Sequence, residues 1–239
     1  EGKNWERFDS IWDDPFIATI PYPVPTVEPH VRSITIDPKN QDIIYAALQV
    51  GYIGKSTDRG KNWKILNKGL DCDVHTITID PTNSKRVLVT TGGHDARLGR
   101  APGRALYVSE DAGESWFPMA MNFNEEYAIP LALDPRDPNR IYSALANGQP
   151  GQWRRRDSGA EAMIIRSKDG GQKWEKIDRA IEAAYFPEAI VVDETMPDRV
   201  YAACRNGDFY STEDGGDSWG KLGLDLKIGD LSNFILTHA

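Results

Sequence analysis

One octapeptide recurs four times along this chain of 239 residues, and it limits the possible folds more than any other feature. Each copy has Ser or Thr at its first position, Asp at the third, Gly at the fifth and Trp at the eighth. The copies occupy residues 56–63, 109–116, 167–174 and 212–219, and a shortened copy occupies residues 2–5. Self-similarity of this kind indicates a repeat architecture, in which each repeat is one small unit of secondary structure.

The residue types within the octapeptide suit a tight turn between two strands. Asp and Ser/Thr side chains can hydrogen-bond the turn amides, and Gly can adopt a positive φ. The Trp then re-enters the sheet as a large apolar anchor. We therefore assign a structural role to the aspartates and tryptophans of the four copies: Asp58, Trp63, Asp111, Trp116, Asp169, Trp174, Asp214 and Trp219.

The intervals between the octapeptides share one strand pattern, with short segments rich in Val, Ile and Tyr bounded by turn residues. The first segment is expected at residues 31–36, 74–79, 129–133 and 189–192; an Asp-Pro turn follows the first three copies, and Asp without Pro follows the fourth. The second is expected at residues 43–48, 86–91, 140–144 and 199–203. A third leads into the octapeptide, as at 106–108 and 164–165, and a fourth begins at its Trp, as at 63–66. Four antiparallel strands per repeat, arranged around an axis, predict an all-β fold, a β-propeller of four-stranded antiparallel blades.

The strand pattern predicts a single domain over residues 1–239. Its complete blades are expected at residues 31–66, 75–119, 127–177 and 187–222, with partial blade strands at 1–8 and 231–239. Residues 16–23 are a further strand candidate, which their prolines weaken. We favour part of a longer propeller over a small five-bladed ring with an irregular closing blade. An open arrangement would expose sheet edges and promote self-association.

The octapeptide is similar to the Asp box, and the chain resembles the Asp-box (BNR-repeat) propellers over nearly its whole length. That superfamily includes sialidases, xyloglucan-degrading glycoside hydrolases, sortilin-type receptor ectodomains and photosystem II assembly factors. The resemblance implies the fold, a glycan or protein ligand, and an extracellular or periplasmic location, although the sequence leaves the compartment open. It says little about activity, because one architecture carries many functions.

Two of these activities are disfavoured by the residues. The Arg-Ile-Pro signature of sialidases is missing, and Tyr201 and Tyr210 belong to repeat strands rather than to a free nucleophile position. The sortilin-type ectodomain carries a cysteine-rich module after its propeller, and this chain has only Cys72 and Cys204. A xyloglucan-type hydrolase stays open, because its catalytic carboxylates lie in loops that carry no short motif.

The composition excludes several further classes. A net charge of −8 gives an acidic surface that repels phosphate backbones, so we expect no nucleic-acid partner. No apolar run approaches the roughly 18 residues of a membrane span. The two cysteines are expected to be free thiols, and neither a metal site nor a cofactor is predicted. The four histidines lie in separate segments: His30, His75, His94 and His238.

Two long insertions distinguish the second and third blades. They occupy residues 93–104 and 147–160, between the second and third strands, at the end of the blade opposite the Asp boxes. Each carries three arginines and one aspartate. The ligand-binding candidates there are Arg97, Arg100, Arg104, Trp153, Arg154, Arg155 and Arg156. Arginine recognises carboxylates and phosphates through a planar two-point fork, and Trp can stack on a sugar. The alternative is that the arginines pair with neighbouring carboxylates such as Glu125, Glu126, Asp13 or Asp14.

The mouth of the central channel is the second candidate site. By register it is lined where the first strand of each blade begins, at Arg32, His75, Ile129 and Glu188, preceded by His30, Asp73, Tyr127 and Phe186. Arg32, His75 and Tyr127 are the ligand-binding candidates here. Asp73 and Glu188 are the candidate catalytic pair, because glycoside hydrolysis needs two carboxylates at a defined separation. The alternative is a polar, water-filled channel entrance.

Two function hypotheses follow. The first is a non-catalytic binding module for a glycan or protein ligand, in particular an anionic one. The second is a glycoside hydrolase that uses the carboxylates of the channel mouth.

Overall fold

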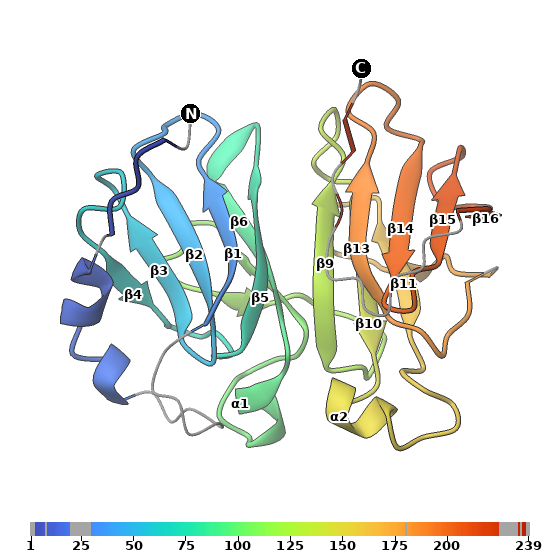
Figure 1. Ribbon diagram of the computed structural model, residues 1–239, viewed down its shortest axis with the longest axis horizontal. Coiled ribbons are helices and arrows are strands. Elements are labelled where there is room, and N and C mark those ends of the chain that lie inside the picture. The colour runs from blue at the N-terminus through green and yellow to red at the C-terminus, as the bar shows by residue number, and fades with distance from the viewer. Residues whose placement is uncertain are drawn as a thin grey trace.

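The computed structural model describes residues 3–7, 9–19, 30–179, 181–224, 234 and 236–237. Within them nearly all of the regular secondary structure is β, and it forms four separate sheets of four antiparallel strands (Figure 1). The predicted fold class, an all-β propeller with four-stranded antiparallel blades, is therefore confirmed.

Each blade is one sheet whose strands follow one another in chain order. Blade 1 contains β1 (His30–Ile36), β2 (Ile44–Gln49), β3 (Tyr52–Ser56) and β4 (Lys64–Leu66). Blade 2 contains β5 (Val74–Asp80), β6 (Asn83–Thr91), β7 (Leu106–Ser109) and β8 (Phe117–Pro118). Blade 3 contains β9 (Tyr127–Leu133), β10 (Ile141–Ala146), β11 (Met163–Ser167) and β12 (Glu175–Lys176). Blade 4 contains β13 (Pro187–Val192), β14 (Val200–Cys204), β15 (Phe209–Thr212) and β16 (Gly220–Leu222).

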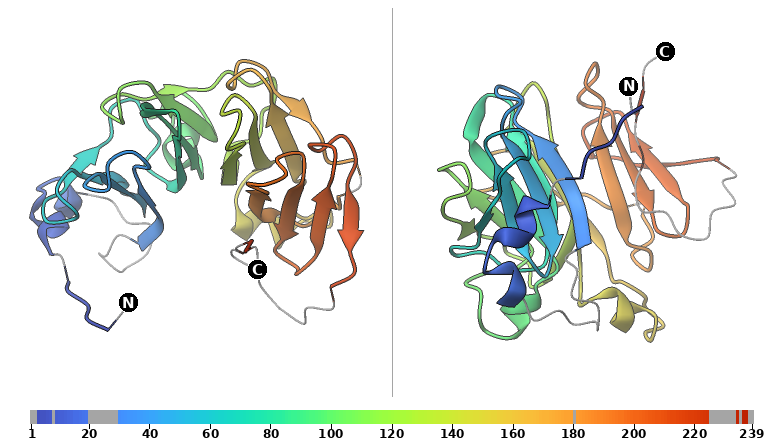
Figure 2. Two further views of the ribbon diagram at one scale, coloured as in Figure 1. Left: turned by 90° about the horizontal axis from the view of Figure 1, so that it is seen from above. Right: turned by 60° about the vertical axis from the view of Figure 1, so that its left-hand side comes forward.

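The four blades follow one another along an arc (Figure 2). Their first strands, β1, β5, β9 and β13, form the inner side, and each contacts the first strand of the next blade. Two short helices, α1 (His94–Arg97) and α2 (Pro150–Trp153), interrupt the insertions of blades 2 and 3. No helix of the described residues is long and apolar enough to cross a membrane.

The hydrophobic core lies between the faces of neighbouring blades. Trp116 packs between blades 1 and 2, Trp174 between blades 2 and 3, and Trp219 between blades 3 and 4. Each Asp-box Trp therefore seals its own blade against the preceding one. Trp63 of blade 1 packs instead near Phe16 and Ile17 of the N-terminal segment.

The Asp boxes also join the blades through hydrogen bonds. The Tyr45 hydroxyl of blade 1 donates to the Ala112 carbonyl of the blade 2 box at 3.0 Å. The Tyr142 hydroxyl of blade 3 donates to the Gly215 carbonyl of the blade 4 box, also at 3.0 Å. Both donors lie on the second strand of a blade, so each of these two boxes is hydrogen-bonded to the second strand of the blade that precedes it.

The N-terminal strand predictions are wrong where the structure describes them. Residues 3–7, part of the expected strand 1–8, are irregular. The described part of the 16–23 candidate forms η2 (Ile17–Thr19), a 3₁₀ helix that follows η1 (Ser10–Asp13). This segment buries apolar side chains on the outer face of blade 1 instead of pairing with a strand. Six of the nine residues of the expected strand 231–239 lie outside the described residues, and the self-association expected of an open arrangement stays a prediction.

Candidate functional site at the loop end of the blades

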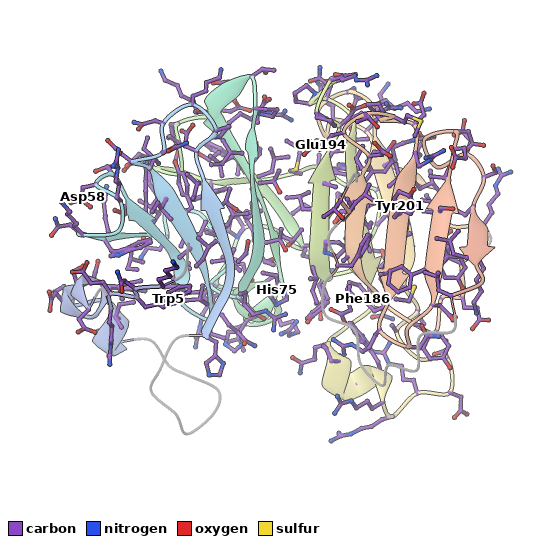
Figure 3. The ribbon with its side chains drawn as sticks, turned by 45° about the horizontal axis from the view of Figure 1, so that its top comes forward. Trp5, Asp58, His75, Phe186, Glu194 and Tyr201 are labelled. Carbon is purple, nitrogen blue, oxygen red and sulfur yellow. The ribbon has the colours of Figure 1, made fainter. Side chains whose placement is uncertain are left out.

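The two ends of the sheets are chemically different. The Asp-Pro turns and the Asp boxes lie at one end, and both α1 and α2 lie at the other, which we term the loop end (Figure 1). Figure 3 shows His75 and Phe186 toward the loop end, whereas Asp58 and Glu194 lie toward the Asp-box end. The first strand of every blade starts at the loop end, so the predicted channel-mouth residues lie there.

A β-bulge recurs where the first strands begin, at the residues that the sequence analysis predicts to line the channel mouth. In blade 1, Val31 pairs with Leu48 and Ser33 pairs with Ala47, which leaves Arg32 as the extra residue. The same irregularity leaves His75 extra in β5 and Glu188 extra in β13, and β9 is irregular between Ala128 and Leu131. A bulge turns a side chain away from the regular alternation of a strand, so the repeat presents one such residue per blade.

Asp73 and His75 form a buried pair at the start of β5. His75 Nε2 lies 3.4 Å from Asp73 Oδ1, and both side chains are largely buried. His75 Nδ1 lies 2.6 Å from the Ala128 carbonyl oxygen of blade 3, so Nδ1 donates to that oxygen. Burial on its own would raise the pKa of Asp73. The hydrogen bond and charge of His75, with Arg32 and His94 adding, outweigh burial and lower that pKa.

Glu188, the second predicted catalytic residue, is also buried and forms an ion pair with Arg205. Arg205 directly follows β14, and its amide donates to the Phe186 carbonyl at 2.9 Å. Arg205 was absent from the sequence-based candidates. The antiparallel pairing of β13 with β14 could have indicated it, because that pairing brings position 205 opposite position 186.

An aromatic cluster lies between the two carboxylates. The Tyr127 ring contacts His75 at a centroid distance of 4.9 Å and Phe186 at 5.7 Å. Burial raises the pKa of the Tyr127 phenol, the charges of Asp73 and Glu188 add to this rise, and Arg32 and Arg205 oppose it. The structure therefore brings the predicted residues Arg32, Asp73, His75, Tyr127 and Glu188 into one electrostatic neighbourhood.

The expectation that Trp153 is a stacking surface for a sugar is wrong. Trp153 is buried in the core between blades 3 and 4, where its ring stacks on Phe186 at 5.1 Å. Its Nε1 donates to the Asn147 carbonyl at 3.0 Å, and the Arg205 guanidinium covers the ring at 5.5 Å. The pairing of a buried indole with aromatic and cationic neighbours anchors the insertion to blade 4.

Two other ligand-binding candidates, His75 and Tyr127, are buried too, so contact with a ligand would require these side chains to move.

The two arginine-bearing insertions meet. The Arg97 guanidinium donates to the Gln149 side-chain oxygen at 3.3 Å, which joins the α1 insertion to the α2 insertion. Some arginines pair with carboxylates, as the alternative interpretation expected: Arg97 lies 3.4 Å from Glu126, and Arg156 lies 3.4 Å from Glu161.

Four other arginines of the insertions are exposed: Arg100, Arg104, Arg154 and Arg155. We term these four the arginine face. The Arg104 guanidinium donates to the Asn124 carbonyl at 2.9 Å. None of the four forms an ion pair with any carboxylate in the part of the chain that the structure describes.

The structure also brings together three potential metal ligands, although the sequence predicts no metal site. Ligand atoms of Cys72, His94 and Asp95 lie within 4.8 Å of one another. Sequence inspection missed this group because it considered spacing among histidines and between cysteines separately. Both cysteines are buried free thiols, in agreement with expectation.

Comparison with known proteins places the fold. A family model described as sortilin, neurotensin receptor 3, matches residues 51–160. The chain is 23% identical over 207 residues to a probable oligoxyloglucan-reducing end-specific xyloglucanase of Neosartorya fischeri. The match covers 80% of this chain but 23% of that enzyme, so the chain spans about a quarter of the length of this relative.

Solved structures give the same architecture. The GH74 xyloglucanase from Xanthomonas campestris superposes with a TM-score of 0.62 at 20% identity, over 83% of this chain and 30% of that one. YCF48 bound to D1 peptide superposes with a TM-score of 0.51 at 13% identity, over 82% of this chain and 55% of that one. The chain therefore has an Asp-box β-propeller fold, like that of the GH74 xyloglucanase.

Proposed function

We propose that this propeller binds a glycan that bears acidic groups, and that the arginine face is the binding surface. The observation that carries the proposal is the hydrogen bond between Arg97 and Gln149, which joins the two loop-end insertions that carry the exposed arginines of blades 2 and 3. The similarity to xyloglucanases supports a carbohydrate as the ligand.

The charge of the arginine face supports an anionic ligand. Arg100, Arg154 and Arg155 each present a planar fork of donors that matches the geometry of a carboxylate or sulfate. The chain as a whole carries a net charge of −8, so this surface differs in sign from the average of the molecule. An acidic glycan is attracted to this surface and repelled by most of the remainder.

The environment of the two buried carboxylates favours binding over hydrolysis. A general acid must hold a proton, yet Asp73 lies beside His75 and Glu188 lies beside Arg205. The hydrogen bond from His75 to Asp73 and the guanidinium of Arg205 beside Glu188 each stabilise the ionised carboxylate. The aromatic cluster around Tyr127 further limits the access of a sugar ring to both groups.

Binding to an array of acidic and neutral glycans tests the proposal. We expect the full chain to bind uronate-containing or sulfated glycans and the double variant Arg154→Ala, Arg155→Ala to bind them about 10-fold more weakly or worse. The matched control is Arg59→Ala with Arg136→Ala, which removes two exposed arginines from the Asp-box end. Unchanged binding in the Arg154/Arg155 variant, or equal binding of neutral glycans, would contradict the proposal.

Glycoside hydrolysis is the second candidate function, and the placement of Asp73 and Glu188 on either side of the Tyr127 cluster at the loop end is the observation that favours it. A carboxylate that stays ionised suits a general base or nucleophile, and Glu188 would then have to act as the acid. Release of reducing sugar from xyloglucan by the full chain, and by Asp73→Asn and Glu188→Gln, tests this function. We expect a loss on the order of 10²-fold or more in both variants if the pair is catalytic. Turnover that survives both substitutions, or no turnover by the unaltered chain, counts against it.

A further inference from the structure

A mixed set of metal-binding groups lies at the loop end between blades 1 and 2. The Cys72 thiol is buried in the connection from β4 to β5, and His94 and the buried Asp95 belong to α1. Their ligand atoms lie within 4.8 Å of one another. Thiolate, imidazole and carboxylate are the three groups that bind Zn²⁺ in proteins.

The backbone around these groups is fixed by two reciprocal hydrogen bonds. The Cys72 amide donates to Asp95 Oδ2 at 3.3 Å, and the Ala96 amide donates to Asp71 Oδ2 at 2.8 Å. Each aspartate therefore binds the segment that carries the other. The Tyr52 hydroxyl of β3 also donates to Asp95 Oδ2, at 3.0 Å. The residues are held in place before any ligand arrives, which lowers the cost of binding.

Two buried carboxyl groups lie in this neighbourhood. Asp71 and Asp95 are both buried, and no lysine or arginine forms an ion pair with either in the portion of the chain that the structure describes. Buried charges in proteins are usually paired or coordinate a metal ion.

We propose that Cys72, His94 and Asp95 bind a zinc(II) ion that joins the α1 insertion to the connection between blades 1 and 2. Binding replaces the thiol proton, which leaves to solvent, by a bond between Sγ and the metal, and no group is oxidised or reduced. Three protein ligands leave one tetrahedral position for a solvent molecule, and the partly exposed His94 lies on the side that solvent reaches. Sulfur among the ligands favours zinc over magnesium or calcium. The proposal concerns a site separate from the arginine face and goes beyond glycan binding.

Cobalt(II) substitution tests the site in the full chain after treatment with a chelator. We expect one Co²⁺ per chain, with the strong visible bands of tetrahedral Co²⁺ and a thiolate-to-cobalt charge-transfer band, and displacement of Co²⁺ by Zn²⁺. In Cys72→Ala the charge-transfer band should vanish and zinc affinity should fall by about 100-fold or more, beyond the effect of losing an outer-sphere partner.

Two further variants make the test decisive. His94→Gln removes a partly exposed ligand, so it should weaken zinc binding while the circular dichroism spectrum stays unchanged. Cys204→Ala removes the other buried thiol and should leave both the spectrum and the affinity unaltered. A charge-transfer band that persists in Cys72→Ala, equal zinc affinity in His94→Gln, or no cobalt binding by the unaltered chain would each overturn the proposal.

Discussion

At the Asp-box end, the four turns of the propeller are nearly identical, whereas at the loop end the four turns share only a bulge. The Gly amide of each Asp box donates to the Ser or Thr oxygen at 2.8–2.9 Å in all four blades. The corresponding connections at the loop end range from two residues in blade 1 to long insertions in blades 2 and 3.

The Asp-box end therefore stabilises the fold in the same way in every blade, whereas the loop end differs from blade to blade. A turn that repeats four times serves every blade equally and cannot mark one binding site. The loop end combines one recurring backbone feature, the bulge, with side chains that differ in each blade: Arg32, His75 and Glu188. A site can be specific only where the repeats differ, so both proposals concern the loop end.

The largest effect that tests this comparison is the loss of an Asp-box tryptophan. Trp174 is buried between blades 2 and 3, and its Nε1 donates to the Gly171 carbonyl at 3.1 Å. We expect Trp174→Ala to lower the free energy of unfolding by about 3–5 kcal/mol in urea titrations. Trp63→Ala is the matched control, because Trp63 occupies the same box position but is only half-buried, and its loss should cost less. Equal costs would mean that burial between blades does not set the contribution of the box.

A smaller effect tests the hydrogen bonds of the box alone. Ser109 Oγ accepts the buried Gly113 amide at 2.8 Å and donates to Asp111 at 2.7 Å. Ser109→Ala leaves that amide without an acceptor, so we expect unfolding to become easier by about 1–3 kcal/mol. Ser109→Thr should be close to neutral, because Thr212 makes the same contacts in blade 4. A large cost for Thr would show that the four boxes are less interchangeable than their distances indicate.

The Asp-box end could be predicted from the sequence because its motif consists of residues that are consecutive in the chain. The Ser or Thr hydroxyl, the Asp carboxylate and the Gly amide that hydrogen-bond one another lie within eight consecutive residues, and the strands between boxes follow from their Val, Ile and Tyr content. The residues predicted to line the channel mouth follow from register counted from the same boxes. The bulge itself was not predicted, since no residue type at Arg32, His75 or Glu188 specifies it.

The loop end was harder because its contacts join distant segments. Trp153 lies in a polar insertion, yet it is buried because Tyr127 and Phe186, from two different blades, provide an aromatic environment for its ring. Cys72 and Asp95 are 23 positions apart, and only the fold shows that one amide and one carboxylate meet. Local patterns carry no signal for such pairs.

The smallest effect is a difference in how acid acts on the two ends. Hydrogen bonds from Ser115 and Ser109 lower the pKa of exposed Asp111 to about 2, even though burial opposes them slightly. Because this pKa is below its ordinary value, Asp111 stabilises the fold above that value and loses the contribution as the pH falls toward about 2.

Burial raises the pKa of Asp71 at the loop end, and the charges of Asp95 and Asp73 add to this rise against hydrogen bonds from two amides. The contribution of Asp71 is therefore complete below its ordinary pKa and declines as the pH rises through the raised value. Urea unfolding of Asp111→Asn and Asp71→Asn from about pH 2.5 to about pH 7 measures both. The stability deficit of Asp111→Asn should grow with pH, while that of Asp71→Asn should shrink. If the stability deficits of both variants, relative to the unaltered chain, change in the same direction with pH, then the two ends do not differ in their electrostatics.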